Sequence, residues 1–231
     1  MRRRSFVQLL AGSALGPAIS MLQVSTAHAE ASVNCPIYMF HLAGAPAVES
    51  VIRANARVGR TPITIAQLAA VVRGDAPLPS QPPFCLTFDD GYLAQYQQGL
   101  PVLERYHVAA TFFIIGTVWR GDGVHSYMSP DQVADVYSRG HEIGSHTVDH
   151  RDLVRLQSKD VNAYWAELLD SKAQLEALID DEVSSFAYPD GSYNLAIMQD
   201  VAGVYDAAVS TAPGTTQTRT NEYALRRTRV S

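Results

Sequence analysis

Short runs of apolar, β-branched and aromatic residues recur along this chain and alternate with amphipathic stretches. This alternation is typical of a parallel α/β fold, in which each buried strand is followed by a helix that covers the sheet. With 231 residues, 47% of them hydrophobic and 18% charged, the chain is sized for one globular domain. The pattern predicts strands over residues 37–40, 84–88, 109–115, 142–144, 184–188, 207–210 and 224–230, and helices over 65–72, 93–106, 131–139, 158–179 and 195–202.

The N-terminal segment differs from the rest of the chain. Three arginines at positions 2–4 precede an uncharged, mildly apolar stretch, and residues 27–29 have the small-x-small pattern of a cleavage site. We therefore predict a signal peptide over 1–29 and a catalytic domain over 30–231. Residues 3–7 fit the twin-arginine motif, which favours that route over an ordinary secretory signal. Either route predicts an exported protein, periplasmic or extracellular after cleavage.

Charge and cysteine content narrow the partners and the chemistry. Cleavage would leave 15 basic residues against 23 acidic ones, and a net charge of about −8 argues against nucleic acid as a partner. No later stretch approaches the ~18 apolar residues of a membrane span. Cys35 and Cys85 could form a disulfide in an oxidising compartment or remain as two buried thiols. The sequence carries no signal for an oligomeric state.

Polar side chains follow four of the predicted strands, at the points where these strands end. Active sites of parallel α/β folds are built where the C-terminal ends of the strands come together. The four clusters are therefore expected to face one another. They are His41 after residues 37–40, Asp89-Asp90-Gly91 after 84–88, His146 to His150 after 142–144, and Pro189-Asp190-Gly191 after 184–188.

Two of these clusters contain residue types that suit a metal site. Taken alone, an Asp-Asp-Gly sequence is also typical of a solvated turn, and His146 and His150 could be surface histidines on a helix. Taken together, two neutral imidazoles and one carboxylate are a common ligand set for a catalytic zinc ion, which keeps one coordination position open. The combination favours a catalytic metal site.

The same stretches resemble a known family. Thr87 to Gly91 and His146 to His150, supported by residues 110–116, 140–145 and 186–189, resemble the polysaccharide deacetylase family, carbohydrate esterase family four. The resemblance covers nearly all of residues 36–230. It implies a distorted (β/α) barrel with the active site at the C-terminal strand ends.

The resemblance also implies roles for individual residues. Asp89 would be the general base, and Asp90 would bind the metal together with His146 and His150. Thr147 would brace the segment from His146 to His150, here called the histidine loop, by hydrogen bonding. Zinc is the expected ion, with cobalt or nickel as alternatives.

The third motif of the family is altered in this chain. Arginine, a variable residue, proline and tyrosine are usual, whereas residues 187–190 are Ala-Tyr-Pro-Asp. Tyr188 and the backbone N–H of Asp190 remain candidates for substrate contact and for holding the oxyanion, because that task needs a donor and no particular side chain. Arg227 or Arg229, in the last predicted strand, would supply the missing charge that orients Asp89.

The usual C-terminal leucine-x-histidine motif, which carries the general acid, is absent because no histidine follows His150. Residues 37–41 resemble the N-terminal strand of a branch of the family with permuted motif order, which includes deacetylases of poly-N-acetylglucosamine. His41 is therefore the candidate general acid. The alternative is a structural histidine at a strand end.

These expectations point to one activity with two alternatives. The leading prediction is metal-dependent hydrolysis of N-acetyl groups on an acetylated amino-sugar polysaccharide, such as poly-N-acetylglucosamine, a chitin-like polymer or a peptidoglycan glycan, with release of acetate. Hydrolysis of O-acetyl esters, as in acetylated xylan, would use the same residues. A carbohydrate-binding protein without catalysis is the alternative from another class.

Overall fold

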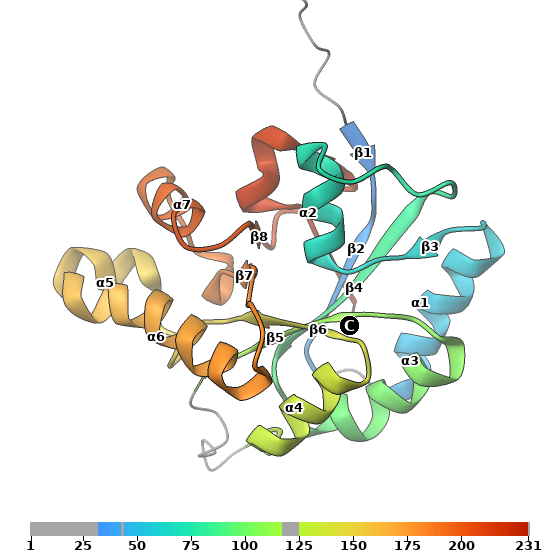
Figure 1. Ribbon diagram of the computed structural model, residues 1–231, viewed down its shortest axis with the longest axis horizontal. Helices are drawn as coiled ribbons and strands as arrows, with labels where there is room; N and C mark the ends of the chain where they lie inside the picture. The colour runs from blue at the N-terminus through green and yellow to red at the C-terminus, as the bar shows by residue number, and fades with distance from the viewer. Residues whose placement is uncertain (1–31, 43, 117–124, 231) are drawn as a thin grey trace, which may run out of the picture.

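Parallel strands form the centre of the protein (Figure 1). The structure is a computed structural model and describes residues 32–42, 44–116 and 125–230. The strands are β1 (Ser32–Asn34), β2 (Ile37–Phe40), β3 (Thr61–Pro62), β4 (Pro83–Asp90), β5 (Thr111–Ile114), β6 (Glu142–Ser145), β7 (Ser185–Ala187), β8 (Ala207–Val209), β9 (Thr216–Thr218) and β10 (Thr228–Arg229). The main sheet is parallel and has the order β10-β2-β4-β5-β6-β7-β8, with β3 paired to β4 beside it. A separate antiparallel pair joins β1 to β9. The predicted signal peptide, residues 1–29, lies outside the described residues.

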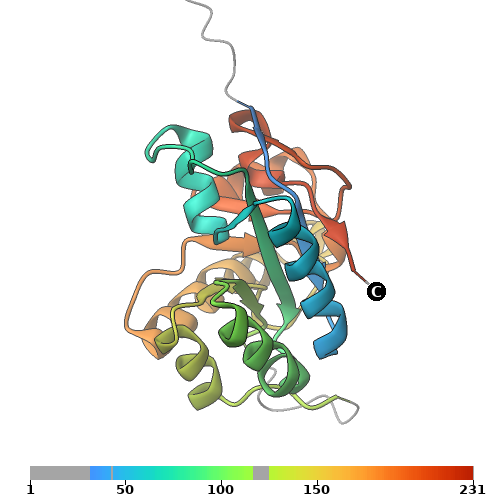
Figure 2. The same ribbon diagram turned by 90° about the vertical axis from the view of Figure 1, so that its right-hand side faces the viewer.

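Helices surround this sheet, as Figures 1 and 2 show from two directions. No helix among the described residues is both long enough and apolar enough to cross a membrane. The α-helices are α1 (Ala45–Arg57), α2 (Ile65–Arg73), α3 (Leu100–Tyr106), α4 (Pro130–Ser138), α5 (Leu153–Lys159), α6 (Val161–Ile179) and α7 (Leu195–Ala202). Shorter turns are a π-helix, η1 (Gln95–Gly99), and two 3-10 segments, η3 (Pro189–Gly191) and η4 (Arg219–Ala224).

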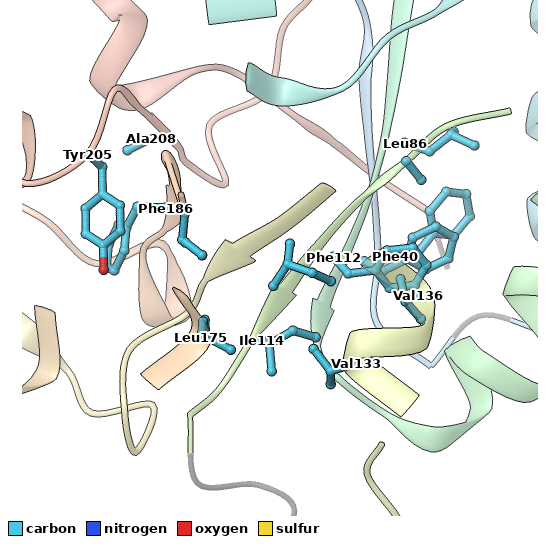
Figure 3. Packing of buried hydrophobic residues seen from close by; sticks show 14 of the residues in the cluster. Phe40, Leu86, Phe112, Ile114, Val133, Val136, Leu175, Phe186, Tyr205 and Ala208 are labelled. Atoms are coloured by element: carbon cyan, nitrogen blue, oxygen red, sulfur yellow. The ribbon is translucent and has the colours of Figure 1, made fainter. Parts of the chain in front are cut away.

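Strand residues alternate between two buried clusters, as expected for a sheet covered on both faces. One cluster contains Phe40, Leu86 and Phe112 and packs against side chains of the surrounding helices, such as Val133 and Leu175 (Figure 3). The other cluster lies on the opposite face and is completed by α2. It includes Ile37, Cys85, Phe113, Ala187, Ala207 and Val209 from the strands, and Ile65, Leu68, Ala69 and Val72 from α2.

The C-terminal segment joins the two edges of the sheet. Leu225 forms an isolated parallel bridge with Val209 of β8, and three residues later β10 pairs with β2 at the other edge. The sheet therefore curls into a distorted barrel, and the predicted α/β barrel class is confirmed. The predicted strand over 224–230 is too long, because residues up to Ala224 belong to η4 and only Thr228 and Arg229 form a ladder.

Two predicted helices differ from the structure. The helix predicted over 158–179 is interrupted at Asp160, which has extended backbone and caps α6 by accepting the N–H of Ala163. The segment before it forms α5, capped by Asp152. The helix predicted over 93–106 contains the π-helix η1, which ends two residues before Pro101. The ring of Pro101 crowds the preceding turn, and this residue lacks an N–H.

The helix α1 was not predicted from the sequence. Its buried side consists only of Val48, Ile52 and the polar Asn55, so few large apolar side chains mark this segment in the sequence. The remaining predicted helices and strands are confirmed, with ends that shift by one or two residues. The Sγ atoms of Cys35 and Cys85 lie 3.7 Å apart as fully buried free thiols, so the disulfide stays a prediction that mass spectrometry of alkylated, non-reduced protein would test.

Candidate metal and catalytic site

A cavity of about 380 Å³ opens at the C-terminal ends of the central strands. Every site residue predicted from the sequence lines it, except Thr147, which is buried behind the cavity wall. The four strand-end clusters therefore meet, as the order of strands and polar residues predicted. The lining residues are Met39, His41, Asp89, Asp90, Tyr92, His146, His150, Tyr188, Asp190, Gly191, Thr211, Arg227 and Arg229.

Asp90, His146 and His150 form a compact group in this cavity. Oδ1 of Asp90 lies 3.4 Å from Nε2 of His146 and 3.7 Å from Nε2 of His150. The three potential ligand atoms all lie within 4.8 Å of one another. One carboxylate oxygen and two imidazole nitrogens at this spacing can converge on a single divalent cation.

His146 and His150 belong to an irregular loop and not to a helix. Thr147 (φ 66°) and His150 (φ 54°) have left-handed backbone conformations, which non-glycine residues seldom adopt. The loop conformation, and not helical i,i+4 spacing, turns both rings toward Asp90. Oγ1 of Thr147 accepts the N–H of His150 at 3.0 Å, so Thr147 makes the bracing contact that the family resemblance implies.

A backbone contact sets the tautomer of His146. Its Nδ1 lies 2.7 Å from the carbonyl oxygen of Ala187, and because a carbonyl oxygen can only accept, Nδ1 carries the proton. In the neutral ring, Nε2 then presents its lone pair on the side of Asp90. Such a partner on the second ring nitrogen is a regular feature of histidines that bind metals.

The charges of the three residues influence one another. Burial acts to raise the pKa of Asp90, but the hydrogen bond and charge of His146, followed by the charges of His41 and His150, outweigh it and lower this pKa. Burial acts to lower the pKa of His146, but Asp90 and Asp89 reverse the effect and raise it. Burial and the charge of His146 lower the pKa of His150. His150 is therefore the histidine that loses its proton more readily.

Asp89 is held by a buried arginine. The guanidinium of Arg227 donates to both carboxylate oxygens of Asp89, at 2.7 and 2.8 Å, and neither residue is more than 2% exposed. Arg227 also donates to the carbonyl oxygen of Ser210 and to Oγ1 of Thr87. Of the two arginines considered from the sequence, Arg227 makes this contact, whereas Arg229 is exposed at the cavity.

Asp89 and Asp90 are adjacent and both line the cavity, although neighbouring residues of a strand normally point to opposite faces. Asp89 follows the alternation of β4 and lies on the same face as Cys85 and Thr87. Asp90 has φ 78°, outside strand geometry, and Gly91 continues the turn with φ 82°. This local departure from the strand lets both carboxylates reach one cavity.

The remaining predicted residues occupy different parts of the cavity. His41, at the end of β2, is half-buried, and its charge acts to lower the pKa of Asp90. The hydroxyl of Tyr188 donates to the carbonyl oxygen of Tyr223 at 2.8 Å, so that hydroxyl is used within the fold. Asp190, with φ 56°, lies in the turn η3 at the cavity wall.

Two residues that contact the site were not predicted from the sequence. Gln95 is buried in η1, and its amide donates to the carbonyl oxygens of both His41 and Asp89, joining the ends of β2 and β4. Glu167 is buried in α6 and contacts the histidine loop. A signal for Glu167 was present, because it falls in the otherwise uncharged stripe of Tyr164, Leu168, Ser171 and Leu175.

Comparison with known proteins identifies the family. The model of the polysaccharide deacetylase family matches residues 78–204, more than half of the 231 residues. YxkH of Bacillus subtilis is 33% identical over 154 residues, which cover 66% of this chain and 53% of YxkH. A chitin deacetylase of a Pestalotiopsis species is 38% identical over 85 residues, 37% of this chain and 27% of that protein. The chain spans about half or less of the length of these relatives.

Solved structures with the same fold cover nearly the whole described chain. The deacetylase PplD of Streptococcus pyogenes, in complex with acetate, has a TM-score of 0.75 at 21% identity and covers 87% of this chain and 93% of its own. IcaB from Ammonifex degensii has a TM-score of 0.76 at 19% identity, covering 86% and 92%. The matched family model and the curled parallel sheet agree with the motifs of the sequence: the chain belongs to the polysaccharide deacetylase family, carbohydrate esterase family four.

Proposed function

We propose that this protein is a metal-dependent deacetylase that hydrolyses N-acetyl groups on an amino-sugar polysaccharide and releases acetate. One observation carries the proposal: the carboxylate of Asp89, oriented by Arg227, lines the same cavity as Asp90, His146 and His150. Two relatives support the substrate class, since their names are chitin deacetylase and peptidoglycan-N-acetylglucosamine deacetylase.

The donor set fits a divalent metal ion, with zinc as the first choice and cobalt or nickel as alternatives. Asp90, His146 and His150 would hold it, because their ligand atoms converge and Nδ1 of His146 is already paired with a carbonyl oxygen. A bound divalent ion supplies a Lewis acid that polarises the acetyl carbonyl and favours deprotonation of water.

The chain itself supplies the proton transfers. Asp89 accepts a proton from the attacking water, and the two hydrogen bonds from Arg227 fix the plane of its carboxylate for this transfer. The backbone N–H of Asp190 would stabilise the oxyanion. His41 donates a proton to the sugar nitrogen as the C–N bond breaks, so that the products are acetate and a free amine.

The experiment is acetate release from N-acetylated chitin oligomers, poly-N-acetylglucosamine, a peptidoglycan glycan and O-acetylated xylan, each with zinc, cobalt and nickel. We expect release from an amino-sugar substrate, and loss of both stoichiometric metal and activity when His146 and His150 are replaced by alanine. Release from xylan alone would favour the O-acetyl esterase alternative. Binding of a glycan without acetate release would favour the carbohydrate-binding alternative, and a double variant with full metal content would contradict the metal assignment.

The export prediction belongs to the same proposal. The signal peptide over residues 1–29 with its twin-arginine motif implies that the deacetylase meets its polymer outside the cytoplasm. N-terminal sequencing of the protein recovered from a bacterial host should locate the cleavage after Ala29. A product that retains its arginines at positions 2–4 would contradict the prediction.

A further inference from the structure

Glu167 of α6 is a carboxylate that takes no part in the proposed chemistry, although it lies directly behind the histidine loop. It is 3% exposed and sits on the buried side of the helix, between Tyr164 and Leu168. A charged group in such a place is costly unless it is well hydrogen-bonded. Its presence therefore requires an account in terms of the groups that it contacts.

The contacts of Glu167 are with the backbone of the loop. Its Oε2 accepts the N–H groups of Val148 and Asp149, both at 2.9 Å. Nε of Arg151, a residue with a half-exposed side chain, lies 3.9 Å from Oε1. One carboxylate oxygen thus holds two consecutive peptide groups of the segment that links His146 to His150.

That segment needs an external acceptor because its backbone is irregular. Left-handed residues such as Thr147 and His150 each cost on the order of 1 kcal/mol or more, and they persist only where surrounding contacts determine them. The two ends of the loop are held by other groups. At its start, Nδ1 of His146 donates to the carbonyl oxygen of Ala187 and the carbonyl oxygen of Thr147 accepts the N–H of Gly116, and at its end the N–H of His150 donates to Oγ1 of Thr147. Glu167 holds the middle of the loop.

We propose that Glu167 is a positioning residue for the metal site, which fixes the separation of His146 and His150 by binding the two peptide groups between them. This inference rests on the proposed function, since it concerns the residues that would bind the metal. Groups that orient ligands from behind typically contribute 10- to 100-fold to metal affinity. Glu167→Leu should therefore raise the dissociation constant for Zn²⁺ about 10- to 100-fold.

A conservative variant separates positioning from charge. Glu167→Gln keeps a carbonyl oxygen that can accept both N–H groups, so it should restore the affinity to within about threefold of the unaltered protein, less than the loss typical for a missing orienting group. The full chain, stripped of metal, is titrated with Zn²⁺ against a chromophoric chelator. The absorption spectrum of the Co²⁺ form reports the coordination geometry independently of activity.

Glu176 provides a matched control on the same helix. It accepts the N–H of Val183 at 3.1 Å and pairs with Lys172, so it also holds backbone, but outside the histidine loop. Glu176→Leu should lower the melting temperature while leaving the Zn²⁺ affinity and Co²⁺ spectrum unchanged. An equal loss of affinity in Glu176→Leu would assign the effect to general destabilisation and overturn the proposal.

The other outcomes are equally distinct. A Glu167→Leu protein with the unaltered Zn²⁺ affinity and Co²⁺ spectrum would overturn the positioning role and leave the proposed function standing. An unaltered protein that binds no stoichiometric metal would refute the proposed metal site itself. Should Glu167→Leu fail to fold, Glu167→Asp replaces it, because its shorter side chain withdraws the acceptor from the loop, and the same thresholds apply.

Discussion

The two ends of strand β6 carry buried histidines whose pKa values are shifted in opposite directions. His141, just before the strand, and His146, just after it, are 5% and 2% exposed. Burial lowers the pKa of His141 to about 4, whereas the carboxylates of Asp90 and Asp89 raise the pKa of His146 above its ordinary value. Similar burial thus gives different protonation, because Asp90 and Asp89 outweigh the effect of burial at His146, whereas the charge of Glu104 does not outweigh it at His141.

The neighbouring groups extend this contrast to the two ends of the sheet. At the N-terminal end, Glu142 accepts hydrogen bonds from the hydroxyls of Thr111 and Ser185 and from the N–H of Ala66, which ties three strands to α2. At the C-terminal end, Asp89 and Asp90 line an open cavity. We infer that polar groups at the first end serve stability and those at the second serve chemistry, as in other parallel α/β barrels.

The largest effect is expected for Asp89 at the C-terminal end. Asp89→Asn should reduce turnover by about 10²- to 10⁴-fold while the metal is retained, because a positioned general base contributes this much. Turnover and metal content are measured on the same preparation. Loss of the metal in this variant would mean that Asp89 is a ligand, and the division of roles between Asp89 and Asp90 would be wrong.

A variant of Arg227 tests the role of the same carboxylate. Arg227→Met removes the group that orients Asp89 and leaves a buried carboxylate without its cation, a change that typically costs about 3–5 kcal/mol of stability. Turnover of the folded variant should fall toward that of Asp89→Asn, with a smaller loss for the exposed Arg229→Met. Equal turnover in both arginine variants and in the unaltered protein would dismiss the orienting role.

The next prediction concerns His41, which also lies at the C-terminal end of the sheet. If His41 protonates the leaving amine, His41→Ala should lower turnover of amide substrates by about 10²-fold with fold and metal content intact. An activated acetyl ester, whose leaving group needs no proton, should be hydrolysed almost normally. An equal loss on both substrates would indicate a structural or metal-orienting histidine, and the resemblance to the permuted branch would lose its main support.

The smallest effect on activity is expected at the N-terminal end, where His141 should alter only the pH dependence of stability. As the pH falls below about 6.5 the unfolded chain takes up a proton at this histidine, whereas the folded chain does not until about pH 4. The free energy of unfolding should therefore fall by roughly 1.5 kcal/mol between pH 6.5 and 5.

The variant His141→Asn keeps an acceptor near the N–H of Ala110, which Nδ1 of His141 accepts at 3.2 Å. Urea unfolding at several pH values should show that the variant lacks this fall in the free energy of unfolding between pH 6.5 and 5. Its turnover at neutral pH should be unchanged. Identical slopes in the two proteins would contradict the lowered pKa, and a large loss of turnover would break the contrast between the two ends of the sheet.

Much of the site was predictable because its residues directly follow apolar runs that can be recognised in the sequence. The apolar runs ending in His41, Asp89-Asp90 and His146 could be recognised one by one, and parallel pairing then brings them to one end of the sheet. The helix α1 and the break at Asp160 were not predicted, since few large apolar side chains mark the first and a single capping aspartate makes the second.

The sequence by itself determined the family, the barrel class and the residue types of the candidate site. Only the tertiary structure decided that Arg227, 138 residues beyond Asp89, orients this carboxylate, that a strained loop and not a helix presents His146 and His150, and that Glu167 supports the loop from behind. The physical reason is that local patterns govern strands and their ends, whereas a buried charge finds its partner only when the closing C-terminal segment and the packed helices bring distant residues together.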